Sequence, residues 1–302
     1  MRARRAIPAA LAGALVVLGV ACADPTATTP LHAPVCLADA SDDPRAWRRI
    51  FDGETFSGWY SWNPVTGRDD AEGFFRIEPG GVIHVLDVPD HDRDQTFAFL
   101  STVESFEDVR IHLEYKWGTK VWNPFRRLGL PRDSGLFYAV SGPDALWPTA
   151  VECQIMLGIP AGTVLLGAAT LDTRARAVPG ELWPVFSPAA PAYSPPRTAD
   201  FNRTAVVAKS AVYERPDDWN TLDVVWVGDR TRHAINGHVV FEAHGLRRRV
   251  DDADPSKDVP LGPGRIALQE EGAEIRFRDI RVQRLDPTCS DLSHSAFEAP
   301  TR

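Results

Sequence analysis

The chain has 302 residues, of which 44% are hydrophobic and 25% charged, and its formal net charge is −8. This composition is that of an ordinary globular protein with enough apolar residues for a full core. The basic residues are scattered apart from Arg247-Arg248-Arg249, which argues against nucleic acid as a partner. The sequence also lacks the patterns of a P-loop, an H-E-x-x-H zinc site, a C-x-x-C pair and a serine-hydrolase elbow.

The N-terminus has the pattern of a secretory signal over residues 1–23, with a basic start and an apolar run too short to cross a bilayer. Cys22 follows residues that resemble a bacterial lipobox, which predicts lipidation of Cys22. Cleavage after Ala23 at an A-x-A site is the alternative, and it would remove that cysteine. Either way we expect export to the periplasm or cell envelope, with membrane contact only through a lipid anchor.

Beyond the signal, residues 24–44 are predicted to be a flexible tether, residues 45–290 one folded domain, and residues 291–302 a tail. Short strand-like runs separated by Gly, Pro, Asp and Asn dominate this domain. The clearest runs are residues 74–77, 82–86, 109–117, 136–140, 151–157, 221–227, 232–235, 239–243, 265–269 and 274–285. Asn236-Gly237 between two apolar runs predicts a tight hairpin. The pattern predicts an all-β fold, a two-sheet sandwich or jelly roll.

Two segments interrupt the strands, and both are predicted to be loops: residues 123–132 and the Pro-, Ala- and Gly-rich residues 160–204. Long ordered loops in compact domains are usually functional, so we expect the second loop either to cover a groove or to be disordered. Cys36 and Cys289 bracket the domain and are expected to form a disulfide if the terminal strands are neighbours. Cys153 falls among apolar positions, where a buried thiol is expected.

The run at residues 151–157 places polar side chains inside an apolar strand. Because strand side chains alternate between faces, Glu152 and Gln154 share one face, and Cys153 and Ile155 share the other. The run lies downstream of Asp133-Ser134-Gly135, which is predicted to be a turn. A solvated outer face and a ligand groove both explain this pattern.

The same alternation occurs in two other strands. Gln269 and Glu271 lie opposite Ile266 and Leu268, and Glu114 and Lys116 alternate with apolar residues. If these strands are neighbours, one concave surface collects Glu114, Lys116, Glu152, Gln154, Gln269 and Glu271. Carboxylates gathered in this way are candidates for general acids and bases.

Each candidate also has a structural interpretation. Asp133 is typical of a residue that caps its own turn, and Glu114 with Lys116 of a structural ion pair. His84 and His233 alternate with apolar neighbours, so we expect buried, hydrogen-bonded histidines. Three loop tryptophans would either stack on sugar rings or pack the loops: Trp122, Trp147 and Trp183.

Six motifs follow one another in the order typical of one protein family. They are IFDGETFSGWY, IHLEYKW, DSGLFY, VECQI, DDWNTLDVVWVGDRTRHAINGHVV and GRIALQEEGAEIRFRDIRV. Together they span about residues 48–285 and resemble the DUF1080 family, also called the 3-keto-disaccharide hydrolase domain. The sequence departs from the family pattern at Asp133, where Asn is commoner, at Ala139, where Arg or His is frequent, and at Glu271, where His is frequent.

The resemblance implies a concanavalin-like jelly roll whose concave sheet forms a sugar groove. It also implies a substrate that is a glucoside or disaccharide already oxidised to a ketone at C3. The ketone acidifies the C2 hydrogen, so a carboxylate can remove it, the aglycone then leaves C1, and water adds to the enone. This chemistry needs a base, an acid and donors to the enolate, but no nicotinamide in this chain.

On this basis Glu152 is the predicted base, with Asp133 as the next candidate, and Glu271 is predicted to handle the leaving group. The predicted sugar-binding residues are Gln154, Gln269, Lys116, Glu114 and Trp147. No cofactor is certain, although a divalent cation such as Ca²⁺ is a candidate at Asp133, Glu152 and Glu271. A non-catalytic carbohydrate-binding module and a conventional two-carboxylate glycosidase remain open.

Overall fold

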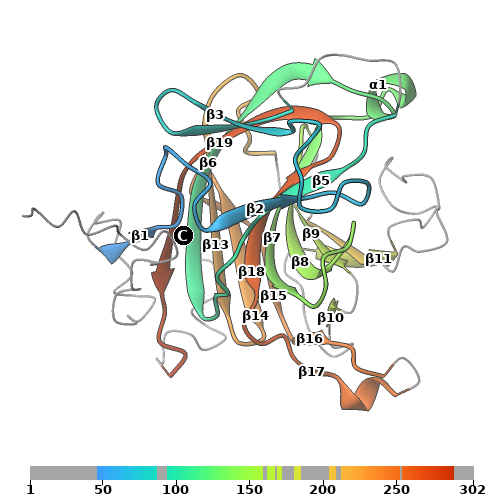
Figure 1. Cartoon of the computed structure of the whole chain (residues 1–302). Coiled ribbons are helices and arrows are strands. Elements are labelled where there is room, and N and C mark those ends of the chain that lie inside the picture. The colour runs from blue at the N-terminus through green and yellow to red at the C-terminus, as the bar shows by residue number, and fades with distance from the viewer. Residues whose placement is uncertain are drawn as a thin grey trace, which may run out of the picture.

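The computed structural model describes residues 46–86, 94–158, 162–166, 169–171, 180–184, 204–208, 212–251 and 254–288. These residues form two large antiparallel sheets that pack face to face in an all-β jelly-roll sandwich, with α1 (Phe125–Leu128) as a single short turn of helix (Figure 1). The prediction of a two-sheet all-β fold is therefore confirmed. In the described part of the chain, no helix is long and apolar enough to span a membrane.

The first sheet, called here the β6 sheet, is built around the longest strand. Its order is β15 (His238–His244), β14 (Arg230–Ile235), β13 (Asn220–Val227), β6 (Val109–Val121), β19 (Ala273–Arg284), β4 (Val82–Val85) and β3 (Phe75–Glu78). Strand β1 (Arg48–Arg49) also pairs with β19. Asn236 and Gly237 take positive φ angles between β14 and β15, which confirms the predicted hairpin.

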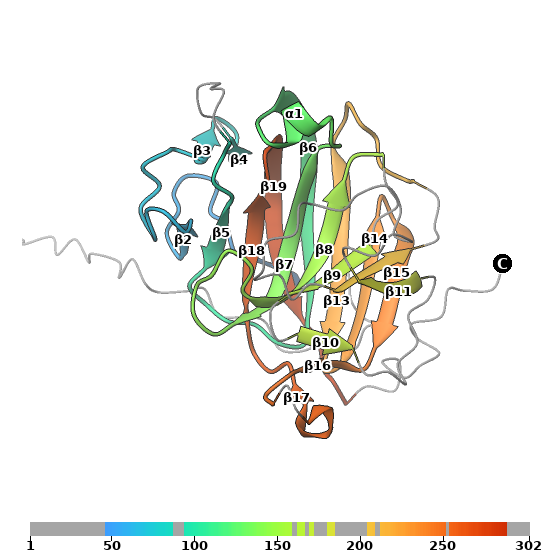
Figure 2. The same ribbon diagram turned by 90° about the vertical axis from the view of Figure 1, so that its right-hand side faces the viewer.

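The second sheet, called here the β7 sheet, carries most of the predicted site. Its order is β11 (Gly180–Pro184), β12 (Thr204–Ala208), β9 (Gly162–Leu166), β8 (Thr149–Met156), β7 (Asp133–Ser141), β18 (Arg265–Glu270), β5 (Ala98–Thr102) and β2 (Trp59–Trp62). Figure 2 shows β18, β7 and β8 side by side at the front of the molecule. A small third sheet joins β10 (Ala169–Leu171), β16 (Leu246–Arg248) and β17 (Val259–Pro260).

All ten strand runs found in the sequence are strands in the structure, but two predicted loops are not wholly loops. The stretch at 160–204 contains β9, β10 and β11, whose residues pair with neighbouring strands, and the rest of the stretch, on which the predicted covering of a groove depends, lies outside the described residues. The stretch at 123–132 contains α1, which ends at Gly129 in the left-handed conformation.

The core lies between the two sheets, and polar contacts of Tyr138 join one sheet to the other within it. Tyr138 on β7 lies 2.7 Å from Thr231 Oγ1 and 2.9 Å from His233 Nε2, both on β14. His84 is also buried, and its ring nitrogens each lie 2.9 Å from a glutamate oxygen, one of Glu78 and one of Glu274. The expectation of buried, hydrogen-bonded histidines is therefore confirmed.

The first and last strands of the described chain are neighbours, because Arg48 pairs with Val282 and Arg49 with Arg281. This is the condition for the predicted disulfide. Cys22, Cys36 and Cys289 themselves lie outside the described residues, as do the predicted signal, the tether and the tail. Cys153 is buried as expected, and burial raises the pKa of its thiol.

Candidate functional site

Three adjacent strands of the β7 sheet bring the predicted polar residues onto its outer face. On β8, Val151, Cys153 and Ile155 pack into the core, so Glu152 and Gln154 point the other way, as the alternation predicted. The register places Gly135 of β7 opposite Gln154 and Phe137 opposite Glu152. On the other side of β7, Ala267 of β18 lies opposite Phe137, and Gln269 follows two residues later on the same face.

The Glu152 carboxylate lies directly against the backbone of Gly135. A Cβ atom built on Gly135 would come within 2.2 Å of Glu152 Oε1 and 2.9 Å of its Cδ. Glu152 is 0% exposed, so the interpretation of this position as a solvated outer face is wrong. The missing side chain at residue 135 leaves the space in which the carboxylate is held.

Asp133 lies in strand β7 and not in a turn. The whole Asp133-Ser134-Gly135 segment is part of the ladder with β8, so the predicted turn, and a capping role for Asp133 within it, are wrong. Asp133 Oδ1 instead accepts a hydrogen bond from Gln154 Nε2 across the two strands. Asp133 is 1% exposed, whereas Gln154 is half-buried.

A second amide–carboxylate pair lies at the end of β18. Gln269 Nε2 donates to Glu271 Oε2 at 2.6 Å, and both residues are buried. Ser134 Oγ donates to the Gln269 carbonyl oxygen at 2.9 Å, which ties β7 to β18 at this point. Within the described part of the chain, Oε1 of Gln154 and Oε1 of Gln269 are buried and accept no hydrogen bond, so each keeps an unused acceptor beside its carboxylate partner.

Glu114 and Lys116 do not join this cluster, because β6 belongs to the other sheet. Glu114 Oε2 accepts from Arg278 Nε at 2.5 Å, so its ion pair is with β19 and not with Lys116. The expectation that all six polar residues converge on one surface is therefore wrong for these two. Alternation gives the face of a strand, but it does not give the sheet to which the strand belongs.

An aromatic cluster borders the polar residues on the β5–β2 side of the same face. The Trp62 and Phe99 rings stack with centroids 5.4 Å apart, and Tyr60 meets Phe99 edge-on. Trp147, from the loop at 142–148, is half-buried and packs against this cluster, so it lies in the candidate site as predicted.

The other two tryptophans do not add to the described site. Trp122 is 0% exposed and packs in the core, which confirms its structural interpretation. The side chain of Trp183 lies outside the described residues. Sequence reasoning missed the aromatic cluster; the alternating aromatic residues of WYSW and FAF, residues 59–62 and 97–99, are the signal that could have found it.

Metal ligation and cavities add two further observations. In the described residues, which include Asp133, Glu152 and Glu271, no three His, Cys, Asp or Glu side chains are grouped to hold a metal ion. A bound divalent cation therefore stays a prediction.

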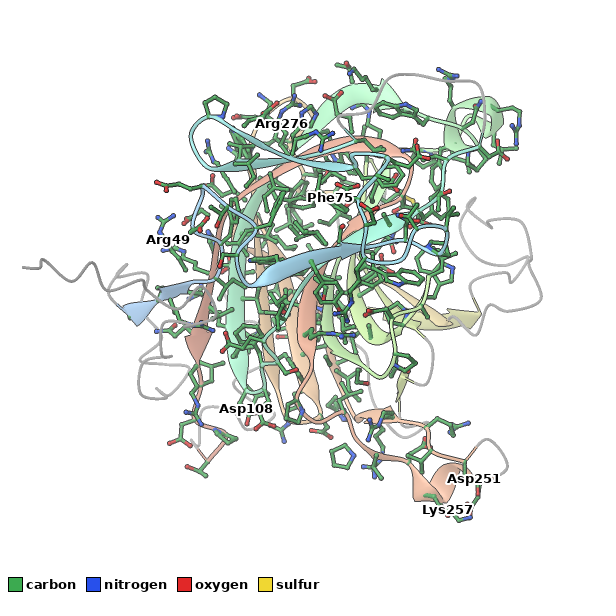
Figure 3. The ribbon with its side chains drawn as sticks, in the orientation of Figure 1. Arg49, Phe75, Asp108, Asp251, Lys257 and Arg276 are labelled. Carbon is green, nitrogen blue, oxygen red and sulfur yellow. The ribbon has the colours of Figure 1, made fainter. Side chains whose placement is uncertain are left out.

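A cavity of about 430 Å³ on the β6 sheet is lined in part by Arg49 (labelled in Figure 3), Asp52 and Arg278, and it includes none of the residues clustered on the β7 sheet.

A family model described as the 3-keto-alpha-glucoside-1,2-lyase-like domain matches residues 46–283. No curated protein matches the chain. Among solved structures, a Parabacteroides distasonis protein provisionally called a glycosyl hydrolase is 18% identical, covers 82% of this chain and 98% of its own, and gives a TM-score of 0.47.

Two further solved structures are similar over most of their length. The carbohydrate-binding module CBM66 of Bacillus subtilis is 12% identical, covers 75% of this chain and 95% of its own, and gives a TM-score of 0.45. The Bacillus licheniformis β-glucanase is 9% identical, covers 79% of this chain and 97% of its own, and gives a TM-score of 0.44.

Proposed function

The chain belongs to the family of 3-keto-alpha-glucoside-1,2-lyase-like domains, a glycosyl hydrolase-like jelly roll, and we propose that it cleaves 3-keto-glucosides. The reaction is elimination of the aglycone followed by hydration of the product. The observation that carries this proposal is the buried Glu152 carboxylate, held against Gly135 between two amide–carboxylate pairs on one face of the β7 sheet. All of these residues lie within the matched range of 46–283.

Glu152 removes the C2 proton of the 3-keto sugar in the first step. The C3 ketone makes this hydrogen acidic, and the electron pair of the C2–H bond moves into the enolate at O3. A base on a strand is held more rigidly than one on a loop, and a defined position is what general base catalysis requires. Gln154 and Gln269 orient the sugar, since the Oε1 atom of each accepts no hydrogen bond from the described residues and can accept one from a sugar hydroxyl.

Glu271 assists departure of the aglycone in the second step. The enolate collapses, the bond from C1 to the glycosidic oxygen breaks, and protonated Glu271 supplies the proton to that oxygen. Water then adds to the enone: its hydroxyl bonds to C1, Glu152 returns a proton to C2, and the remaining proton of the water restores protonated Glu271. The sum is hydrolysis to the 3-keto sugar and the free aglycone. Gln269 Nε2, 2.6 Å from Glu271 Oε2, fixes the position of this carboxyl group.

A non-catalytic carbohydrate-binding module is the second candidate. The half-buried rings of Tyr60 and Trp62 favour it, because flat aromatic surfaces are what sugar rings stack against in binding modules. A binding module does not need a carboxylate in a space shaped for it, and the position of Glu152 therefore favours the enzyme.

The test is incubation of the protein with matched pairs of 3-keto and unoxidised disaccharides, followed by measurement of the released aglycone. We expect release from the 3-keto member of each pair alone. Equal cleavage of both members would identify a conventional glycosidase. Binding of both without release would identify a carbohydrate-binding module.

A further inference from the structure

The loop at residues 142–148 lies across the outer face of the β7 sheet. Its ends are close together, since Ser141 of β7 pairs with Thr149 of β8. Asp144 in this loop nevertheless contacts Tyr60 on β2, three strands away from β7 in the sheet order. Adjacent strands are about 4.8 Å apart, so the loop reaches roughly 14 Å across β18 and β5. In Figure 2 the connection from β7 to β8 runs out toward β5.

Asp144 fastens this loop to three other segments. Tyr60 Oη donates to Asp144 Oδ1 at 2.7 Å, and Arg68 donates to Oδ2 from Nε at 3.0 Å and from Nη2 at 2.8 Å. Arg265 Nη2 lies 3.3 Å from Oδ1, and the Arg68 guanidinium covers the Tyr60 ring at 3.9 Å from its centroid. The Asp144 side chain is 11% exposed and that of Arg265 is 15% exposed, so their charge-assisted contact is largely shielded from solvent, whereas the Arg68 side chain is 60% exposed. We call this group the Asp144 clasp.

The other end of the same loop places Trp147 beside the second amide–carboxylate pair. The Trp147 ring lies 6.2 Å from the Phe97 ring, centroid to centroid. Phe97 immediately precedes β5, two residues before Phe99, and Phe99 pairs with Gln269. Trp147 and Phe97 therefore form an aromatic wall next to Gln269 and Glu271, on the side of the cluster away from Glu152.

We propose that Trp147, positioned by the Asp144 clasp, forms the aglycone subsite, and that the preferred aglycone is a single ring with a flat apolar face. This inference rests on the proposed function, which assigns the C2 base to Glu152 and the leaving group to Glu271. With these roles the keto sugar lies over β7 and β8, and the aglycone extends from Glu271 toward the wall. A phenolic ring and the C–H face of a second pyranose share the required chemistry, since both stack on an indole ring.

The clasp also limits how far the aglycone can extend. Because loop 142–148 crosses β18 and β5, it closes the face on the β5–β2 side, where Phe99 is 1% exposed. A first ring can stack on Trp147, but a second ring in the same direction meets the loop.

The test uses three 3-keto-glucosides that differ only in the aglycone: methyl, phenyl and glucosyl. We expect Trp147→Ala to raise the KM for the phenyl or glucosyl substrate about five- to tenfold and that for the methyl substrate far less, with kcat kept. Trp147→Phe keeps an aromatic ring, so its KM for the phenyl and glucosyl substrates should lie close to the wild-type value. Trp219→Ala is the matched control, since this half-buried tryptophan lies under Arg278 near the other sheet. The phenyl and glucosyl arms identify which ring is preferred.

Asp144→Asn keeps the size of the side chain and removes the charge that holds Arg68 and Arg265. As a positioning change it should raise KM with the same aglycone dependence as Trp147→Ala, and by a smaller factor. An equal rise for all three substrates, or no rise for any of them, would overturn the proposal. Thermal melting of each variant checks that the fold is kept.

Calorimetric titration in a Glu152→Gln background separates this inference from the proposed function. The same three compounds are titrated with Trp147 present and with Trp147→Ala. Ring-dependent loss of affinity supports the wall even if the wild-type protein releases no aglycone, an outcome that would reject only the proposed function. Identical affinities with and without Trp147 would reject the wall even if the wild-type enzyme is active.

Discussion

The Glu152 carboxylate occupies the space that a side chain on Gly135 would need, since a Cβ there would come within 2.2 Å of Glu152 Oε1. The other sheet repeats this relationship, because a Cβ on Gly118 would come within 2.2 Å of Glu274 Cδ. Neither glycine has a positive φ, so each is needed for space and not for backbone conformation. In each sheet a buried carboxylate thus packs against the backbone of a glycine. Only one of the two carboxylates, that of Glu152, lies in the candidate site.

These two similar glycine–carboxylate contacts give the first prediction. Gly135→Ala should displace the Glu152 carboxylate and lower kcat by at least about tenfold, because a general base displaced by an ångström loses most of its effect. Gly118→Ala is the matched control: it crowds Glu274 equally but should leave kcat near the wild-type value. Both variants should lose roughly 1–3 kcal/mol of unfolding free energy from overpacking. Kinetics and urea unfolding measure the two effects, and equal losses of kcat would contradict the assignment.

Glu270 gives the second prediction, on stability against pH. Burial raises the pKa of Glu270 well above 4.5, against the opposing hydrogen bond from the Gly272 N–H at 2.8 Å. A raised pKa in the folded state means that its contribution to stability is fully present below pH 4.5 and is lost as the pH rises from there toward the folded pKa. Glu270→Gln keeps the acceptor for Gly272 and removes the ionisation.

We therefore expect Glu270→Gln to raise the unfolding free energy at pH 8 by at least about 1 kcal/mol relative to the wild type, and to change it little at pH 4. Denaturant unfolding at both pH values measures this. Glu107→Gln, at an exposed position, serves as the control and should change the unfolding free energy little at either pH. A gain of the same size at pH 4 and pH 8 would show that ionisation of Glu270 is not the cause.

The third prediction is a disulfide between Cys36 and Cys289. Strands β1 and β19 pair antiparallel, so the segment before β1 and the segment after β19 leave the sheet in the same direction. The bond would close a very long loop, for which the chain-entropy estimate is on the order of 4–5 kcal/mol. Intact mass with and without reductant measures it, and the same spectrum distinguishes lipidation at Cys22 from cleavage after Ala23. Free thiols at both positions in protein from the periplasm would reject the bond.

Most strands were predictable because one face is buried and the other is polar, which gives the alternation that the sequence shows. Strands β2 and β5 were missed for a physical reason. Their outer-face residues, such as Trp62 and Phe99, are themselves packed against other aromatic rings, so these strands show no apolar–polar alternation. Because the outer faces of β2 and β5 are also buried, the sequence lacks the alternation by which these strands, which form the aromatic part of the site, would be recognised.

The candidate site was predictable where it depends on alternation within one strand. Glu152, Gln154 and Gln269 share the expected face because a strand has a period of two. Glu114 and Lys116 were misplaced because strand pairing is a long-range property. The Asp144 clasp was missed for the same reason, since Tyr60 and Arg68 precede Asp144 by 84 and 76 residues.

The last prediction concerns the base. Glu152→Gln keeps the shape that fits against Gly135 and removes the basicity, so it should slow exchange of the C2 hydrogen of a 3-keto-glucoside in deuterated water by about 10²–10⁴. Substrate affinity, measured by calorimetry, should stay within about twofold of wild type. Glu271→Gln should leave C2 exchange nearly intact and slow aglycone release, because it acts after the proton is removed. Glu274→Gln, the equivalent carboxylate at Gly118, should change neither rate. Wild-type C2 exchange in Glu152→Gln would assign the base elsewhere, with Asp133 next to be tested, since its Oδ1 accepts the Gln154 amide on the same face.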